Sequence, residues 1–273
     1  MKKKNSDKTV ELTMDASFSC PFCAHDVPVA WADITLQMFD LMFSYLPELV
    51  QQQSAHLRTH PLERATLIVK YRNDPLLFKN LTSKLPEQRV LCLEHHRRSI
   101  MVEAEKNDWP PKEDIHLDTL DRRVRGLASL MDDIIEDPTH HPAGASITAA
   151  FTTMAAVGSL AYRNSTALQA RMLAARPGYY GPQGARIIAQ ALAELYIHDP
   201  VGALGPDELG HFRPFEYVSE LLCPVAVRLL VHQDMRDRRM ANGAGVGDGT
   251  EDWEAVDALV RDTAEYGDIL FSL

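Results

Sequence analysis

Three cysteines and one histidine in the first hundred residues have the types and spacing of a closed metal site. Cys20 and Cys23 form a Cys-x-x-Cys knuckle, and Cys92 precedes His95 by three positions. Three thiolates and one imidazole complete a tetrahedral zinc site and leave no coordination position for a substrate or an activated water. The pattern therefore predicts a structural Zn²⁺ ion, and it argues against a catalytic one.

Either His95 or the adjacent His96 could be the fourth ligand. The 68 residues between Cys23 and Cys92 exceed the spacing of a compact zinc finger. An ion here would clip an N-terminal loop onto a helix, with Cys92 and His95 on one face of its first turn. The alternative is thiols without metal. Four cysteines in 273 residues are too few for a disulfide scaffold, and Cys223, in an apolar run, is predicted to be a buried thiol.

Apolar periodicity predicts helices along nearly the whole chain. The expected helical stretches are 31–46, 61–71, a segment after Pro75, 93–106, 117–135, 145–174 with a weak point at Gly158, 185–196, 214–235 and 253–270. A short strand pairing of Phe18 with Val90-Leu91 is expected beside the knuckle. The predicted fold is mainly α, a helical bundle with a small N-terminal zinc knuckle and little or no sheet.

The expected organisation is a flexible leader, a zinc-clipped helical part and a larger helical bundle. Their predicted ranges are 1–17, 18–110 and 111–273, the last two forming one continuous module. Pro110 and Pro111 stop the helix between these parts. No run approaches the roughly 20 apolar residues of a membrane helix, and no apolar export segment follows the N-terminus. We therefore expect a nuclear or cytoplasmic protein that is neither secreted nor membrane-bound.

A formal net charge of −10 argues against general binding of polyanions. Local contact with an anion or a nucleic acid remains a hypothesis, based on arginines and a glycine-rich loop before a helix. Free amides at the helix start and two tyrosines could receive a phosphate or a base. The candidate residues are Arg97, Arg98, Arg176, Gly178, Tyr179, Tyr180, Gly181 and Gly184. We favour the alternative that the glycines allow a sharp turn and the tyrosines pack between helices.

Several distinct sequence words occur in a fixed order along the chain. They are CPFC at 20–23, CLEHHR at 92–97, EAEKNDWP at 103–110, RPGYYGPQGA at 176–185, EYVSELLCPVA at 216–226 and AEYGDILF at 264–271. In these words the chain resembles the fungal "restriction of telomere capping" C-terminal domain family, from about Ser19 to Phe271. The resemblance assigns the metal to Cys20, Cys23, Cys92 and His95. It implies a nuclear or cytoplasmic protein linked to telomere capping, and it implies no known reaction.

The leading hypothesis is a non-enzymatic, zinc-stabilised helical module that presents a surface to a protein partner. The first alternative is a nucleic-acid-binding domain that uses Arg97, Arg98, Tyr179 and Tyr180. The second is a metal-dependent enzyme, which would need an open ligand position that four protein ligands do not leave. The sequence does not indicate the partner or the oligomeric state.

Overall fold

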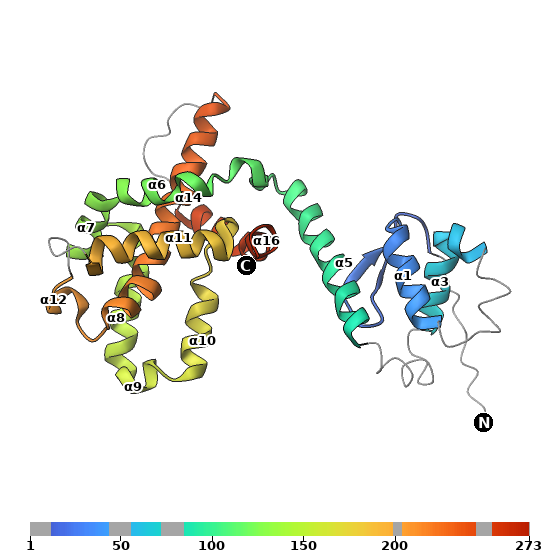
Figure 1. The fold of residues 1–273 in the computed structure, drawn as a ribbon, viewed down its shortest axis with the longest axis horizontal. Helices are drawn as coiled ribbons and strands as arrows, with labels where there is room; N and C mark the ends of the chain where they lie inside the picture. The colour runs from blue at the N-terminus through green and yellow to red at the C-terminus, as the bar shows by residue number, and fades with distance from the viewer. Residues whose placement is uncertain (1–11, 44–55, 72–84, 199–203, 244–252, 273) are drawn as a thin grey trace. The chain divides into compact units, whose positions relative to one another are not determined.

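The computed structural model describes residues 12–43, 56–71, 85–198, 204–243 and 253–272. The chain forms two compact units, Met1–Val102 (unit 1) and Glu103–Leu273 (unit 2), both drawn in Figure 1. The sequence placed a boundary near residue 110, eight residues beyond this division. Of the expected leader, residues 1–11 lie outside the described part of the chain. Residues 12–16 directly precede the first strand, and residue 17 is the first residue of that strand.

Unit 1 is a two-stranded hairpin packed with helices. Strand β1 (Ser17–Ser19) pairs antiparallel with β2 (Asp26–Pro28). Its longer helices in the described ranges are α1 (Ala32–Phe43), α3 (Pro61–Tyr71) and α5 (Leu85–Lys106), and the last residues of α5 belong to unit 2. Apolar side chains of the hairpin, α1, α3 and α5 form one buried cluster, which includes Val27, Met38, Ile68 and Leu91. The hairpin is thus held against helices that follow it in the sequence.

The expected strand pairing of Phe18 with Val90-Leu91 is wrong. Phe18 lies opposite Val27 in the hairpin, and Val90 and Leu91 are helical residues of α5. Closing the short loop between β1 and β2 costs less chain entropy than closing one of about 70 residues. Helix α5 also begins earlier than predicted, at Leu85 and not at residue 93.

A buried arginine joins two helices of unit 1. Arg64 on α3 is 1% exposed, and its guanidinium donates to the backbone oxygens of Leu57, Arg58 and Ala32. It also donates to the Thr35 hydroxyl on α1 at 2.9 Å. Hydrogen bonds from nearly every guanidinium donor offset the cost of burying the charge. Arg64 therefore fixes how the N-terminal turns of α1 and α3 meet.

Unit 2 is a bundle of helices, as the sequence predicts. Its helices of seven residues or more in the described ranges are α6 (Leu120–Gly126), α7 (Ala128–Glu136), α8 (Ala145–Val157), α10 (Ser165–Ala174), α11 (Gly181–Ala193), α14 (Cys223–Ala241), α15 (Trp253–Asp262) and α16 (Ala264–Leu270). Shorter helices are α9 (Ser159–Tyr162), α12 (Pro206–Leu209) and α13 (Pro214–Tyr217), and π-helical turns occur at η6 (Glu194–His198) and η7 (Val218–Leu222). Helix α11 contacts α6, α14 and α16, which makes it central to the core (Figure 1).

Two predicted segments of unit 2 are divided differently in the structure, and one predicted break is confirmed. The stretch 117–135 divides at Leu127 into α6 and α7. The segment 176–184 is not all loop, because Gly178–Tyr180 forms a 3₁₀ turn (η5) and α11 begins at Gly181. The break at Gly158, with a positive φ of 81°, lies where the sequence predicts it. The expected helix after Pro75 and the 242–250 glycine segment fall largely outside the described residues. No helix in the described ranges combines the length and apolarity needed to cross a bilayer.

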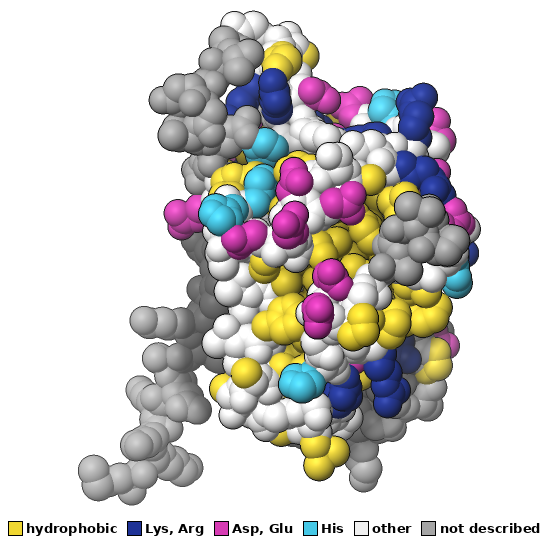
Figure 2. Space-filling model, turned by 90° about the vertical axis from the view of Figure 1, so that its left-hand side faces the viewer, with side chains coloured by type: hydrophobic (Ala, Val, Ile, Leu, Met, Phe, Trp, Pro, Cys, Tyr) yellow, Lys and Arg dark blue, Asp and Glu magenta, His cyan; other side chains and the backbone are white. Residues whose placement is uncertain are grey.

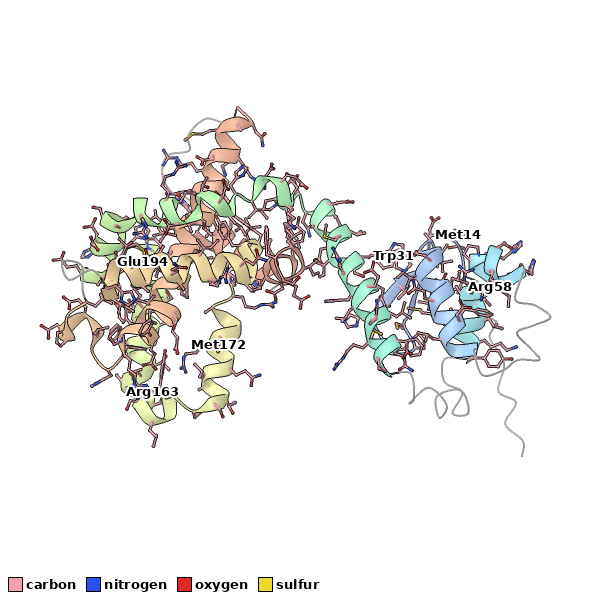
Figure 3. The ribbon with its side chains drawn as sticks, viewed as in Figure 1. Met14, Trp31, Arg58, Arg163, Met172 and Glu194 are labelled. Atoms are coloured by element: carbon pink, nitrogen blue, oxygen red, sulfur yellow. The ribbon has the colours of Figure 1, made fainter. Side chains whose placement is uncertain are left out.

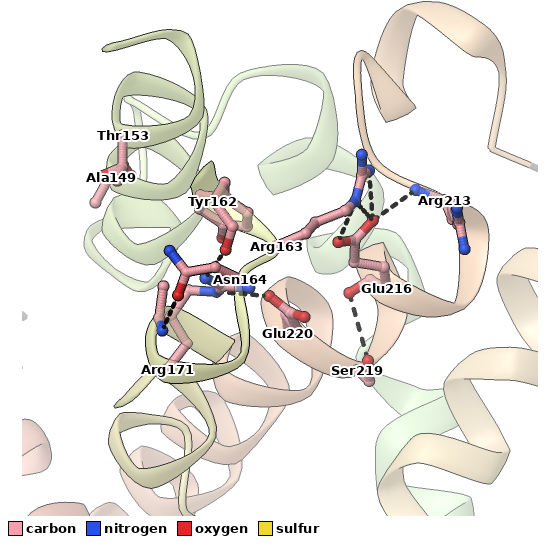
Figure 4. A network of polar contacts seen from close by, with 11 residues as sticks. Ala149, Thr153, Tyr162, Arg163, Asn164, Arg171, Arg213, Glu216, Ser219 and Glu220 are labelled. Atoms are coloured by element: carbon pink, nitrogen blue, oxygen red, sulfur yellow. Dashed lines mark hydrogen bonds and ion pairs between the residues drawn. The ribbon is translucent and has the colours of Figure 1, made fainter. Parts of the chain in front are cut away.

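Two ion pairs attach the α9–α10 corner to the helices that precede α14. The Arg163 guanidinium donates to both carboxylate oxygens of Glu216, and Arg171 Nε donates to Glu220 at 2.8 Å (Figure 4). The Arg171 guanidinium carbon also lies 3.7 Å from the centre of the Tyr162 ring. Figure 3 labels Arg163 and Met172 on this corner. Because both pairs are only partly exposed, they hold the corner more firmly than surface pairs would.

Candidate metal centre

The structure brings together four donors that lie far apart in sequence. One ligand atom each from Cys20, Cys23, Cys92 and His95 lies within 4.8 Å of the others. Cys23 Sγ is 3.3 Å from His95 Nε2. Zn–S and Zn–N bond lengths imply sulfur–nitrogen edges of about 3.6 Å and sulfur–sulfur edges of about 3.8 Å in a tetrahedral site. The donor spacing therefore fits a single tetrahedral ion, and the cluster can hold a metal.

The knuckle turn aims the first two sulfurs at one point. Cys20 N donates to the His25 oxygen at 2.7 Å, and Ala24 N donates to the Cys20 oxygen at 2.9 Å. Ala24 has a φ of 63°, a left-handed conformation that closes this tight turn. The amide of Phe22 points at Cys20 Sγ over 3.4 Å. Amide donors facing a sulfur stabilise its thiolate form, which is the form that binds a metal.

Helix α5 supplies the other two donors from its interior. The sequence predicted Cys92 and His95 in the first turn of a helix. Because α5 begins at Leu85, both lie beyond its first turn. Their spacing of three still places both on one helix face. His95 is fully buried and belongs to the cluster, whereas His96 is half-buried and lies outside it. The geometry thus selects His95 from the two adjacent histidines.

Burial and local hydrogen bonds shift the pKa values of the four donors in different directions. Burial raises the pKa of Cys20 to about 11 and also raises the pKa of Cys92. At Cys23, burial is outweighed by hydrogen bonds from the backbone and side chain of His25, and its pKa is lowered. Burial and the nearby His25 and His96 lower the pKa of His95, which favours the neutral imidazole. A metal would displace the thiol protons, since ligating cysteines bind as thiolates.

A metal at this position would have four protein donors available to it. The donors are two sulfurs from the hairpin turn and a sulfur and a nitrogen from α5, so four protein ligands fill a tetrahedral shell. Cys20 is 3% exposed and belongs to the buried cluster of unit 1, against which Cys23 and Cys92 also pack. The ion would therefore join the hairpin to α5 at the edge of that core.

Two of the sequence words lie in direct contact in unit 2. A Cβ on Gly267 of α16 would come within 2.1 Å of the Gly178 oxygen and 2.8 Å of the Gly181 nitrogen. The side chain of Arg176, just before η5, pairs with Asp268 of α16. Gly178 and Gly181 also have positive φ values of 61° and 60°. The RPGYYGPQGA and AEYGDILF words therefore encode one close crossing of two backbones.

Comparison with protein families assigns this part of the chain. Residues 148–272 match the model of the RTC4-like domain, which confirms the family that the sequence words suggested. These residues belong to the RTC4-like domain family. The match lies entirely within unit 2, so the Cys/His cluster of unit 1 lies outside the matched residues. The comparisons with curated proteins and with solved structures found no match.

Inside the RTC4-like domain, both loop tyrosines are buried. Tyr179 and Tyr180 are 2% and 1% exposed, and both hydroxyls donate to Asp234 Oδ2 at 2.6 Å. Arg123 from α6 donates to Asp234 Oδ1, also at 2.6 Å. Burial first, and then neighbouring negative charge, raise the pKa of both tyrosines. Neither ring has a face open to a base, and this geometry matches packing between helices.

The remaining candidates for anion contact are dispersed. Gly181 lies under the Gly267 carbonyl, so α16 covers the start of α11, and a Cβ on Gly184 would meet Tyr180. In unit 1, Arg98 pairs with Asp33 at 2.6 Å and with Glu94 at 3.1 Å, while Arg97 is exposed on α5. The structure does not bring these candidates together into one surface within either unit, and nucleic-acid contact stays a prediction.

Sequence reasoning missed Asp234. It stands at the start of a charged stretch, where acids usually face water, yet it accepts hydrogen bonds from three buried or half-buried side chains. Its position three residues after Val231 on the predicted helix was the available signal, because that spacing returns to the core-facing side. Charge composition alone did not indicate that Asp234 faces the core.

Proposed function

We propose that this protein is a non-enzymatic helical module, stabilised by zinc in unit 1, that binds a protein partner. The observation that carries the proposal is the closed Cys₃His donor set, buried at the edge of the unit 1 core. A catalytic zinc keeps a position for water or substrate, and this donor set leaves none. Chemistry at the ion would therefore require a ligand to leave, and the role that fits is holding the hairpin against α5.

The match to the RTC4-like domain supports a proposal for the cellular process in which the protein acts. The family name refers to restriction of telomere capping, and we propose a nuclear role in telomere or chromatin maintenance on that basis. The partner in such a role would be a protein rather than DNA, for two reasons. The net charge of −10 opposes binding of polyanions, and the loop tyrosines that could have stacked on bases are buried.

Metal analysis of the purified full chain tests the zinc assignment. We expect one zinc per chain, its loss in Cys23→Ser and His95→Ala, and its retention in Cys223→Ser and His96→Ala. Cys223 is a matched control, because it is a half-buried thiol of unit 2 outside the cluster. Loss of zinc should destabilise unit 1, since structural zinc contributes directly to folding. A metal that leaves without lowering the melting temperature of unit 1 would indicate an exchangeable, catalytic type of site and contradict the proposal.

The interaction role needs its own experiment. Affinity purification of the tagged protein from its native host, followed by mass spectrometry, should recover a protein partner in a nuclear fraction. Nuclease treatment before capture separates a protein contact from a bridge through nucleic acid. Recovery that disappears after nuclease treatment, together with direct and salt-sensitive DNA retention by the pure protein, would favour the nucleic-acid hypothesis instead.

A further inference from the structure

Unit 2 contains a cavity that the sequence analysis did not anticipate. It lies among α7, α8, η6 and the α12–α13 segment, and its volume is about 670 Å³. This size is within the range of about 300–1,000 Å³ that holds small ligands in proteins. All of its described lining residues fall between Asp132 and Tyr217, and none is a lysine, an arginine or a histidine. The cavity thus belongs to unit 2 alone and has no cationic group on its described walls.

The floor of the cavity is apolar and aromatic. The Phe151 and Tyr217 rings meet at an angle of 63° with their centres 6.3 Å apart, and the apolar side chain of Ile147 lies beside them. Tyr196 lies in the π-helical turn η6, and Tyr217 directly precedes the second π-helical turn, η7. π-Helical turns are rare in proteins, and those that occur are often found at functional sites. Aliphatic walls can pack against the alkyl stem of a long side chain, and the face of an aromatic ring can attract a cation.

Four carboxylates surround this floor, and we call the feature the acidic-rim cavity. Asp132 and Glu136 come from α7, and Asp207 and Glu208 come from α12. All four are exposed, and none forms an ion pair with a described lysine, arginine or histidine. Figure 2 views the side of unit 2 on which α7 and α12 lie, and it shows acidic side chains gathered around apolar surface. The rim carries negative charge that no described cation neutralises.

The acids of the rim do not form a metal site. Within the described residues, the group of ligands close enough to share an ion is the Cys/His cluster of unit 1. The carboxylates instead stand around an apolar floor, and Asp132 accepts a hydrogen bond from Tyr196 Oη at 2.9 Å. An extended organic cation can reach several of these oxygens while its stem covers the floor, whereas a bare ion cannot.

The hydroxyl of a largely buried tyrosine provides a second sign of a ligand. Tyr217 is 1% exposed and lines the cavity, and its hydroxyl forms no hydrogen bond with a described residue, yet it is not among the fully enclosed unpaired atoms, so its remaining accessible surface is available to a ligand. Burial, followed by the negative charge of Glu208, raises its pKa to about 12. The group is therefore a neutral hydroxyl at physiological pH, with lone pairs that can accept a hydrogen bond from an ammonium or guanidinium.

We propose that the acidic-rim cavity holds a lysine or arginine side chain from a basic segment of a protein partner. The charge of the rim, the unpaired hydroxyl and the apolar floor match the head and the stem of such a side chain. This inference deepens the proposed interaction function by naming the chemistry of the partner. It does not depend on zinc, because the cavity lies outside unit 1.

The test measures binding of a fluorescein-labelled octapeptide of alternating lysine and serine to the full chain by anisotropy. We expect saturable binding that weakens as NaCl rises from 50 to 300 mM. Tyr217→Phe should raise Kd about tenfold, since a hydrogen bond to a charged group is lost. The double variant Glu136→Gln/Asp207→Asn should raise Kd about fivefold, as expected for two exposed charge contacts. The same peptide with acetylated lysines should not bind.

A matched control separates the cavity from overall charge. Glu113→Gln/Asp118→Asn removes the same two charges from exposed positions of unit 2 that do not line the cavity, and it should leave Kd unchanged. Equal loss in both double variants, competition by spermidine as effective as that of the unlabelled peptide, or no binding at 50 mM NaCl would each overturn the proposal. The rim variants change exposed side chains, so their result stands even if Tyr217→Phe folds poorly. Zinc content measured on the same samples shows whether the metal assignment has failed separately.

Discussion

Removing the metal should lower the melting temperature of unit 1 and leave that of unit 2 unchanged, and tryptophan fluorescence can follow unit 1 separately. Trp31 is half-buried against the unit 1 core (Figure 3), whereas Trp109 and Trp253 belong to unit 2. A Trp109→Phe/Trp253→Phe background therefore leaves one reporter, in the unit that contains the cluster. In that background we compare Cys92→Ser with Cys223→Ser, each melted with and without a strong chelator.

The size of the effect follows from the loop that the ion closes. A link from Cys23 to Cys92 encloses 68 residues, and for a loop of this length the loss of chain entropy in the unfolded state is worth about 4 kcal/mol at 25 °C. A domain of roughly 100 residues has only about 5–15 kcal/mol of stability. At about 4–8 °C per kcal/mol, the Trp31 transition should fall by roughly 15–30 °C in Cys92→Ser.

The parent and Cys223→Ser should show the same fall only when the chelator is present. The far-UV circular dichroism of unit 2 should keep its own transition in every sample. If the Trp31 transition is identical with and without chelator, and Cys92→Ser melts like the parent, then no ion constrains the hairpin and α5. The reasoning about the cluster would then be wrong, whatever the donor distances.

Two further substitutions test the interior of the RTC4-like domain. Gly267→Ala should destabilise unit 2 by at least about 3 kcal/mol in urea unfolding, because its Cβ would lie 2.1 Å from the Gly178 backbone oxygen. Gly126→Ala, with no atom within 4 Å of the new Cβ, should be neutral or stabilising by up to about 1 kcal/mol; equal effects of the two would contradict the close crossing. Asp234→Ala should cost about 3–5 kcal/mol, since it leaves Tyr179, Tyr180 and a guanidinium without their acceptor. A loss below 1 kcal/mol would show that water replaces the carboxylate.

Local sequence patterns predicted the donor set and most helices. Cys20 and Cys23 share one turn, and Cys92 and His95 share one helix face, so their spacing alone indicated two half-sites. Helical periodicity depends on neighbours three and four positions apart, which a single sequence displays directly. The 3.6-residue period also located α3 at its observed bounds and the break at Gly158.

Contacts between distant segments were harder to predict. The partner of Phe18 was wrong because strand pairing leaves no local trace, and an alternating pattern fits many partners. The role of Asp234 was not predicted, because an acid inside a charged stretch is identical in sequence whether it faces water or two tyrosine hydroxyls. His95 and His96 could be separated only once α5 had a fixed rotation against the hairpin.

By itself, the sequence determined a helical protein with one closed set of metal donors, since both follow from residue types at short and regular spacings. The tertiary structure alone decided that the glycine words cross in contact and that Tyr217 and four carboxylates line one cavity. Those features join side chains up to about ninety positions apart. Their meeting depends on how whole helices pack, which is a property of the complete core rather than of any segment.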